Sequence, residues 1–206
     1  MTLLELTLPG LFRQAIAEKP FRLEVKDNIL RIVEEKNLDG DKCQWVEISL
    51  KNQPSVFCFS IDFADKAGYD TTFRFFNTDE KTSISGLRSK NDAIIICEKD
   101  GKAFVFLIEL KSKDTGKYLQ QLKLSKLFVN FVIDRFNCIK SINDNKLDKH
   151  HGFIKEDIEF RGILFRCRNR QDKGGTSKKI LFEDENGLLM AYRPCHECYP
   201  LEIFLP

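Results

Sequence analysis

The sequence predicts a single α/β domain with a β-rich amino-terminal portion. The chain has 206 residues, which suits one domain, and 42% of them are hydrophobic, including 18 Phe. Short apolar runs separated by turn residues fill its beginning, and one long amphipathic segment follows a central hairpin pattern. We therefore expect one domain over 1–206, with the β-rich portion over about 1–63 and the core that carries the function over about 64–206.

The amino-terminal portion is predicted to begin with a helix and to continue as strands. Apolar residues at helical spacing predict a short helix over 8–19, which Pro20 ends. Four strands are then expected, because apolar runs alternate with turn chemistry; they are FRLEV (21–25), ILRIVEE (29–35), CQWVEISL (43–50) and SVFCFSIDF (55–63). The polar stretch 64–90 predicts loops, with one short strand over 73–76.

The second half is predicted to contain the longest helix. Apolar residues at helical spacing favour a helix over 117–136, and Asp114 and Thr115 are candidates for its amino-terminal cap. A strand and a polar loop follow it. The strands expected after this helix cover 160–168, 179–183, 188–192 and 201–204.

The stretch NDAIIICEKDGKAFVFLIELK, residues 91–111, predicts the central hairpin. Asp100-Gly101 is a strong signal for a two-residue type I′ turn, in which both central residues have positive φ. That register places Asp92 opposite Glu109, with Lys111 on the same face. Away from these charges both faces are apolar, which is typical of a central strand pair that is covered on each side.

The three charged residues require an explanation within so apolar a hairpin. Two opposed carboxylates repel each other and lose hydration, so a cation is needed nearby. Lys111 can pair with one of them, and a hard divalent cation such as Mg²⁺ would neutralise the rest. Such an ion polarises a phosphoryl oxygen and lowers the pKa of bound water, while a nearby lysine orients or deprotonates that water. The pattern therefore indicates metal-dependent phosphoryl chemistry.

Three short motifs around this hairpin match a known superfamily. They are Asn91-Asp92, Glu109-Leu110-Lys111 and Gln120-Gln121-Leu122. In this combination, over 90–136, the chain resembles the PD-(D/E)XK superfamily of restriction-endonuclease-like nucleases. The resemblance implies an αβββαβ core with a mixed central sheet, and hydrolysis of nucleic-acid phosphodiester bonds with Mg²⁺ or, in its place, Mn²⁺. It implies DNA more than RNA as the partner, and a role in DNA processing or in defence against foreign DNA.

The resemblance also implies a role for each matched residue. Asp92 and Glu109 would bind the metal, and the carbonyl of Leu110 would be a further ligand. Lys111 would activate the attacking water. Gln121 matches a catalytic glutamine that some exonuclease-like members place on the following helix.

Two positions depart from the family pattern. Asn91 stands where the motif has proline, and Ser125 stands where those exonuclease-like members carry a tyrosine. Many members add a carboxylate from the first helix, for which Glu18 is the candidate. Asp79 and Glu80 are alternatives to Glu18.

Basic residues near the motifs are candidates for contacts with phosphates. The net charge is only +2, so any affinity for a polyanion must come from local clusters. Lysine and arginine contacts supply such affinity without regard to base sequence. The candidate nucleic-acid contacts are Lys113, Lys117, Arg166, Arg168, Arg170 and Lys173. The alternative is that these residues are ordinary solvated surface.

The seven cysteines are scattered, and several lie within apolar runs, where a thiol behaves as a small hydrophobic group. Cys195 and Cys198 have the spacing of a zinc knuckle, but no second pair of this kind occurs, so we favour structural thiols. His150 and His151 would complete a zinc site only if the fold brought them close. We expect no signal peptide, no membrane span and a cytoplasmic location.

Two other functions stay open on the sequence. One is a non-catalytic module that retains the nuclease fold and binds nucleic acid or protein. The other is a protein-interaction domain in which the Phe-rich β portion forms a homodimer. The intact set of Asp92, Glu109 and Lys111 favours the enzyme, because a lapsed site would be expected to lose at least one of them.

Overall fold

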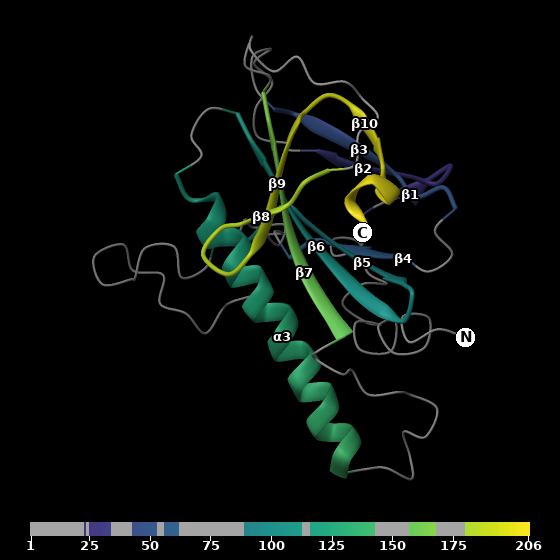
Figure 1. Cartoon of the computed structure of the whole chain (residues 1–206), viewed down its shortest axis with the longest axis vertical. Helices are drawn as coiled ribbons and strands as arrows, with labels where there is room; N and C mark the ends of the chain where they lie inside the picture. The colour runs from purple at the N-terminus through teal and green to yellow at the C-terminus, as the bar shows by residue number, and fades with distance from the viewer. Residues whose placement is uncertain are drawn as a thin grey trace, which may run out of the picture.

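A computed structural model gives the arrangement of the chain, a mixed α/β protein made mostly of strands (Figure 1). The residues that it describes are 23, 25–33, 43–52, 56–61, 89–112, 116–142, 157–167 and 180–206. They form two mixed sheets and one long helix, α3 (Tyr118–Ile142). The predicted helix over 8–19 and the predicted strand over 73–76 lie outside these residues.

The larger sheet has six strands in the order β4-β5-β6-β7-β9-β8. Their bounds are β4 (Val56–Phe59), β5 (Ala93–Lys99), β6 (Lys102–Lys111), β7 (Ile158–Arg166), β8 (Glu183–Asp184) and β9 (Leu189–Pro194). The sheet is mixed, because β6–β7 and β7–β9 are parallel whereas the other three pairs are antiparallel. Its central strands are almost continuously buried, as expected of strands covered on both faces.

The smaller sheet has four strands in the order β1-β2-β3-β10. They are β1 (Val25–Lys26), β2 (Ile29–Val33), β3 (Trp45–Ser49) and β10 (Cys198–Pro200), the last parallel to β3. Buried residues alternate with more exposed ones along β2 and β3, so one face of this sheet packs on the core and the other faces solvent.

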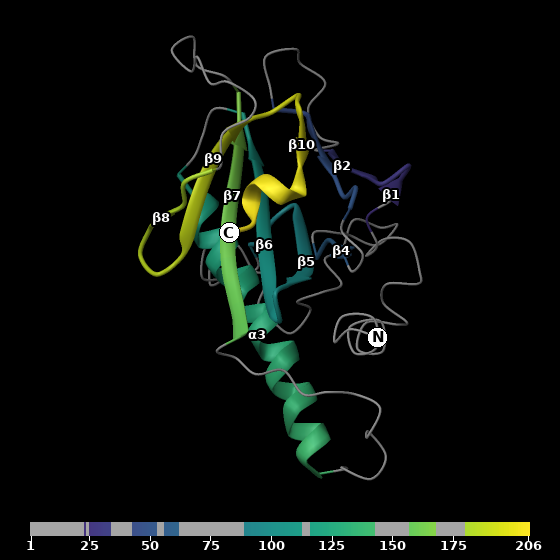
Figure 2. The same ribbon diagram turned by 45° about the vertical axis from the view of Figure 1, so that its right-hand side comes forward.

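Helix α3 and the smaller sheet lie on opposite faces of the larger sheet (Figure 2), and an apolar layer fills each interface. One layer joins it to the smaller sheet and includes Ile48, Ile95 and Phe106. The other layer joins it to α3 and includes Leu107 and Leu122. No helix within the described ranges has both the length and the apolar character needed to cross a membrane.

Gly162 allows α3 to lie close to the larger sheet. A Cβ atom at this position of β7 would lie 2.2 Å from the sulfur of Met190 and 3.1 Å from Cδ1 of Leu122. The first of these distances is shorter than real Cβ contacts allow, so a side chain here would force its neighbours to move. The distance between the first turns of α3 and the sheet therefore depends on glycine at this position.

The central hairpin has the predicted turn. Asp100 and Gly101 have φ values of 52° and 77°, as a type I′ turn requires. Strand pairing runs from Lys99–Lys102 at the turn to Ala93–Ile108, in the predicted register. Residues along β5 and β6 alternate between the two apolar layers, which confirms the prediction that both faces of this strand pair are apolar and covered.

The carboxyl-terminal segment corrects one prediction. Leu201–Phe204 was expected as a strand and is a 3₁₀ helix, η3. Its buried residues are Leu201 and Phe204, which a 3₁₀ turn places on one side whereas a strand would place them on opposite faces. The strand in this region, β10, ends just before this helix. The strand predicted over 179–183 is also corrected, because β8 shares only residue 183 with it and 180–182 are not in a strand.

Candidate active site

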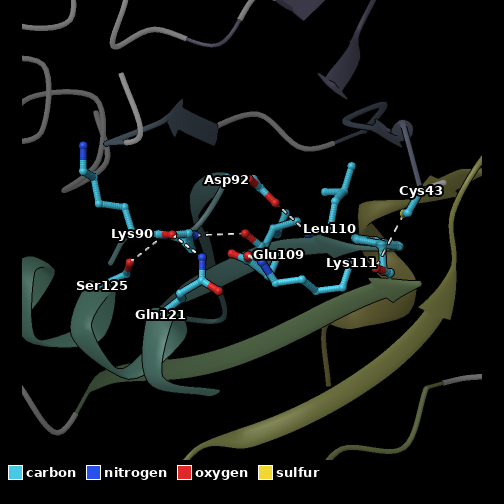
Figure 3. Close-up of polar contacts among 11 residues, drawn as sticks. Cys43, Lys90, Asp92, Glu109, Leu110, Lys111, Gln121 and Ser125 are labelled. Atoms are coloured by element: carbon cyan, nitrogen blue, oxygen red, sulfur yellow. Dashed lines mark hydrogen bonds and ion pairs between the residues drawn. The ribbon is translucent and has the colours of Figure 1, made fainter. Parts of the chain in front are cut away.

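The candidate charged residues lie where β5 begins and β6 ends, beside the first turns of α3 (Figure 3). Asp92 directly precedes β5, and Lys111 is the last residue of β6. Strand pairing in the hairpin stops at Ala93–Ile108, one residue before the predicted Asp92–Glu109 pair. We call this end of the hairpin, beyond Ala93–Ile108, the open end, and the end at Asp100 the turn end.

Glu109 and Lys111 form an ion pair on the face that α3 covers. The Lys111 Nζ atom lies 2.5 Å from Oε1 of Glu109. Glu109 is 1% exposed and Lys111 is 23% exposed. A buried carboxylate without a cation would be strongly disfavoured, so the lysine compensates for the burial of the acid. The pair also fixes the ammonium group at the end of the strand.

Asp92 takes a different position from the one predicted. Its carboxylate accepts a hydrogen bond from the Leu110 N–H at 2.6 Å. Its own N–H donates to the Ile108 carbonyl at 3.1 Å. The Asp92 carboxylate thus takes the place of a backbone partner for β6 just before β5 begins. It points to the β6 backbone, while the Glu109 carboxylate points toward Lys111 (Figure 3). This arrangement avoids the repulsion that direct opposition of two carboxylates would cause.

Helix α3 holds the backbone that leads into Asp92. Gln121 donates from Nε2 to the Lys90 carbonyl at 2.9 Å. Ser125, one helical turn later, accepts from the Asn91 N–H at 3.3 Å. Gln121 was predicted to be catalytic, and the contact that it makes here is with backbone. We infer that it helps to position Asp92.

The two departures from the family motif meet in this contact. Asn91 is fully buried, and its backbone N–H needs an acceptor, which the buried hydroxyl of Ser125 supplies. A proline at position 91 would have no N–H and would need no such acceptor. The side chain of Asn91 donates to the carbonyls of Ile108 and Ala93. The only sequence signal for this contact is that the two departures, Asn91 and Ser125, occur together.

Arg166 is the basic candidate that the structure brings to this site. It pairs in register with Lys111 across the parallel strands β6 and β7. Its guanidinium carbon lies 5.3 Å from the centre of the Tyr192 ring. Lys117 is exposed just before α3. Other predicted site residues lie outside the described part of the chain: Lys113, Arg168, Arg170, Lys173, Glu18, Asp79 and Glu80.

Sequence reasoning missed a cluster of two tyrosines and a glutamate next to Arg166. Tyr118, in the first turn of α3, donates to Glu185 at 2.8 Å and lies 3.0 Å from the Tyr192 hydroxyl. Tyr192 also donates to Glu185. Burial, followed by the hydrogen bond to Glu185, raises the pKa of Tyr192, and burial likewise raises the pKa of Tyr118. Both phenols therefore stay protonated at neutral pH and hold α3 to β9.

The donor atoms at the open end suit a hard cation. Asp92 and Glu109 provide carboxylates, and Leu110 provides a carbonyl on the Asp92 side of β6, because the N–H and C=O of a strand residue point toward the same neighbour. Oxygen donors of this type fit Mg²⁺, which keeps several waters and takes phosphate oxygens as further ligands. Within the described ranges, no group of three or more His, Cys, Asp or Glu side chains is arranged to hold a metal.

The two cysteines with zinc-knuckle spacing do not share one environment. Cys195 is buried, and Cys198 is exposed at the start of β10. His150 and His151 lie outside the described residues. The Cys195 thiol instead lies 3.9 Å from the thiol of Cys167.

Comparison of the chain with family models, with curated proteins and with solved structures found no match. The function must therefore be inferred from the chemistry of the site.

Proposed function

We propose that the chain is a Mg²⁺-dependent nuclease that hydrolyses phosphodiester bonds, in DNA more than in RNA. The observation that carries this proposal is the buried Glu109–Lys111 ion pair beside Asp92, at the adjoining ends of two core strands. The succession β4-β5-β6-α3-β7, with these four strands as neighbours in one sheet, supports a restriction-endonuclease-like core.

Different residues of the site would hold the metal and orient the attacking water. Mg²⁺, when bound, would polarise the scissile phosphate and lower the pKa of a bound water. Asp92 and Glu109, with the Leu110 carbonyl, are the residues that would hold it. Lys111 is partly exposed and is held by Glu109, so its ammonium group can orient the attacking water.

Arg166 and Lys111 together favour a phosphate substrate. Their register pairing puts two cationic side chains on neighbouring strands, whose backbones are about 4.8 Å apart. Both lie on the α3 face, because the residues two positions earlier, Glu109 and Leu164, are on that face. Charge-assisted hydrogen bonds from arginine to phosphate oxygens are strong and directional. We assign Arg166 to holding the phosphate that flanks the scissile bond.

A cleavage assay tests the proposal. Purified protein is incubated with single-stranded, duplex and branched DNA and with RNA, in Mg²⁺, in Mn²⁺ or in a chelator. We expect metal-dependent cleavage that Lys111→Ala reduces by about 10²- to 10⁴-fold, the usual contribution of a group that acts on the attacking water. Lys102→Ala is the matched control, because it removes an exposed lysine from the other end of the same strand.

The outcome that contradicts the proposal is equally specific. If every substrate stays intact in Mn²⁺, the protein is not a nuclease on these substrates. If Lys111→Ala and Lys102→Ala cleave equally well, the activity does not come from this site.

A non-catalytic nucleic-acid-binding module is the second candidate function. It is favoured by the lack, in the residues that the structure describes, of a complete group of three metal-ligating side chains. On this alternative the protein binds DNA without cutting it in any metal, and Arg166→Ala weakens binding while Asp92→Asn leaves it unchanged. A gel-shift titration in parallel with the cleavage assay separates the two functions.

A further inference from the structure

Two cysteines lie side by side at the carboxyl ends of neighbouring parallel strands. Cys167 directly follows β7, and Cys195 directly follows β9. Arg166 and Pro194 are the last paired residues of these strands, and the Cys195 N–H donates to the Arg166 carbonyl at 3.0 Å. The two cysteines therefore lie opposite each other one position beyond the last paired residues, and their sulfur atoms are 3.9 Å apart.

The backbone at this position suits a disulfide. Neighbouring strands are about 4.8 Å apart, which falls within the Cα separation of about 4.4 to 6.8 Å that disulfides require. Both side chains contact the apolar layer between the two sheets, so they point to the same side. Bond formation would need the sulfur atoms to approach by about 2 Å, which side-chain rotation can supply.

The environment of Cys195 favours its thiolate, which is the reactive form. Hydrogen bonding to the Cys43 thiol lowers the pKa of Cys195, a contact with Cys167 adds to this effect, and burial opposes it. Cys97 provides a contrast within the same molecule, because burial raises its pKa to about 12. Cys43 itself is 1% exposed, and its thiol donates to the Phe165 carbonyl with a sulfur-to-oxygen distance of 3.6 Å.

We propose that Cys167 and Cys195 are a thiol pair that a hydroperoxide oxidises to a disulfide joining the ends of β7 and β9. The Cys195 thiolate attacks one peroxide oxygen, the O–O bond breaks, and Cys195 becomes a sulfenic acid as hydroxide leaves and is protonated to water. The Cys167 thiolate then attacks the Cys195 sulfur, the S–S bond forms, and the S–O bond breaks with release of a second water. Two thiols lose two electrons and two protons, and hydrogen peroxide is reduced to two waters.

This modification site is independent of the nuclease proposal, although it lies next to it in the fold. Arg166 directly precedes Cys167, and its carbonyl accepts the Cys195 N–H. A disulfide would therefore fix the end of β7 on the side opposite to Lys111.

The test is a mass measurement on the full-length protein after treatment with hydrogen peroxide and alkylation of the remaining thiols. We expect the oxidised protein to carry two fewer alkyl groups than untreated protein, a cross-linked peptide that contains Cys167 and Cys195, and reversal by dithiothreitol. The cross-link should form between these two thiols although Cys138 is the more exposed thiol, because the sulfur atoms of Cys167 and Cys195 already lie 3.9 Å apart. Cys138→Ser is the matched control and should leave the cross-link unchanged.

Three outcomes would overturn the proposal, and none requires a variant that folds poorly. One is a stable sulfinic acid on Cys195 without any cross-link. Another is a disulfide that joins Cys195 to Cys43 instead of Cys167. The third is a zinc ion retained by the native protein in native mass spectrometry that protects these thiols from peroxide, which would assign them to a metal site.

Discussion

The two ends of the central hairpin are built by different means. At the turn end, Asp100 and Gly101 adopt positive φ, and the β5–β6 pairing that starts at Lys99–Lys102 joins residues close together in the sequence. At the open end, the backbone pairing stops, and side chains replace it. The Asp92 carboxylate accepts a hydrogen bond from the Leu110 N–H, and the Asn91 side-chain amide donates one to the Ile108 carbonyl.

This difference shows which contacts a sequence pattern can predict. The turn depends on two adjacent residues, so the sequence indicates both its type and its register. The open end depends on α3, through the contacts of Gln121 with Lys90 and of Ser125 with Asn91, which are 31 and 34 residues apart along the chain. Variants at the two ends should therefore differ in the property that they change. Open-end variants should change activity, and turn-end variants should change stability alone.

The largest effect is expected at Asp92. Asp92→Asn removes the charge but keeps an oxygen that can accept the Leu110 N–H, whereas Asp92→Ala removes both. Both variants should lose cleavage activity by at least about 100-fold, as expected for an electrostatic group in the site. Only Asp92→Ala should also lose about 1 to 3 kcal/mol of unfolding free energy, because it leaves a backbone N–H without its acceptor. Parallel cleavage and urea titrations measure the two effects, and equal stability loss in both variants would contradict this reading.

A smaller effect is expected at the contact between α3 and Asn91. Ser125→Ala should lower the unfolding free energy by about 1 to 3 kcal/mol, because the buried Asn91 N–H loses its acceptor. In an Asn91→Pro background the same change should have less effect, since that N–H is already gone. A double-mutant cycle by urea denaturation measures the coupling. Strict additivity would show that the two residues do not act together.

Gly101→Ala tests the turn end. Its φ of 77° is unfavourable for alanine, so we expect a loss of about 1 to 2 kcal/mol in unfolding free energy. No atom would lie within 4 Å of the added Cβ, so the loss should come from the backbone alone. Cleavage activity per folded molecule should be unchanged, in contrast to Asp92→Asn. A loss of activity in Gly101→Ala at full folding would remove the distinction between the two ends.

The smallest effect concerns alkaline pH and the tyrosines that hold the first turn of α3. Burial raises the pKa of Tyr118 and Tyr192 above their ordinary value of 10.0. Above that value the unfolded chain releases protons that the folded chain retains, so stability should fall as the pH rises. Urea titrations between about pH 9 and 11 should show this fall, and Tyr192→Phe should make it less steep. An unchanged slope in that variant would exclude Tyr192 as its source.

Much of the fold could be predicted from local patterns, and the exceptions share a cause. The hairpin, α3 and β7 are long segments with clear periodicity, and their positions differ from the predictions by only a few residues at the ends. The LEIF segment has the composition of a strand, but burial of residues three apart makes it a 3₁₀ turn. Strand β10 is short and pairs with β3 from far along the chain, so no local pattern indicated it.

The candidate site likewise contains residues that local patterns could locate and residues that depend on distant parts of the chain. Asp92, Glu109 and Lys111 could be located because a hairpin register and a short motif bring them together. The position of Arg166 beside Lys111 depends on the parallel register of β6 and β7, which no turn between them fixes. The cluster around Glu185 requires α3, β9 and a loop to meet, and each contributes only one side chain to it. A sequence can list such residues but cannot show that they are neighbours.

The missing side chain at Gly162 connects the sheet to the chemistry of the open end. Leu122, which an added methyl group would approach, is adjacent to Gln121 in the first turns of α3. We expect a larger residue at 162 to displace the Met190 side chain first and also to press on Leu122, which would shift this part of the helix and lengthen the contact of Gln121 with the Lys90 carbonyl. A position in the middle of β7 thus limits how accurately the backbone before Asp92 is held, although it touches none of the charged groups.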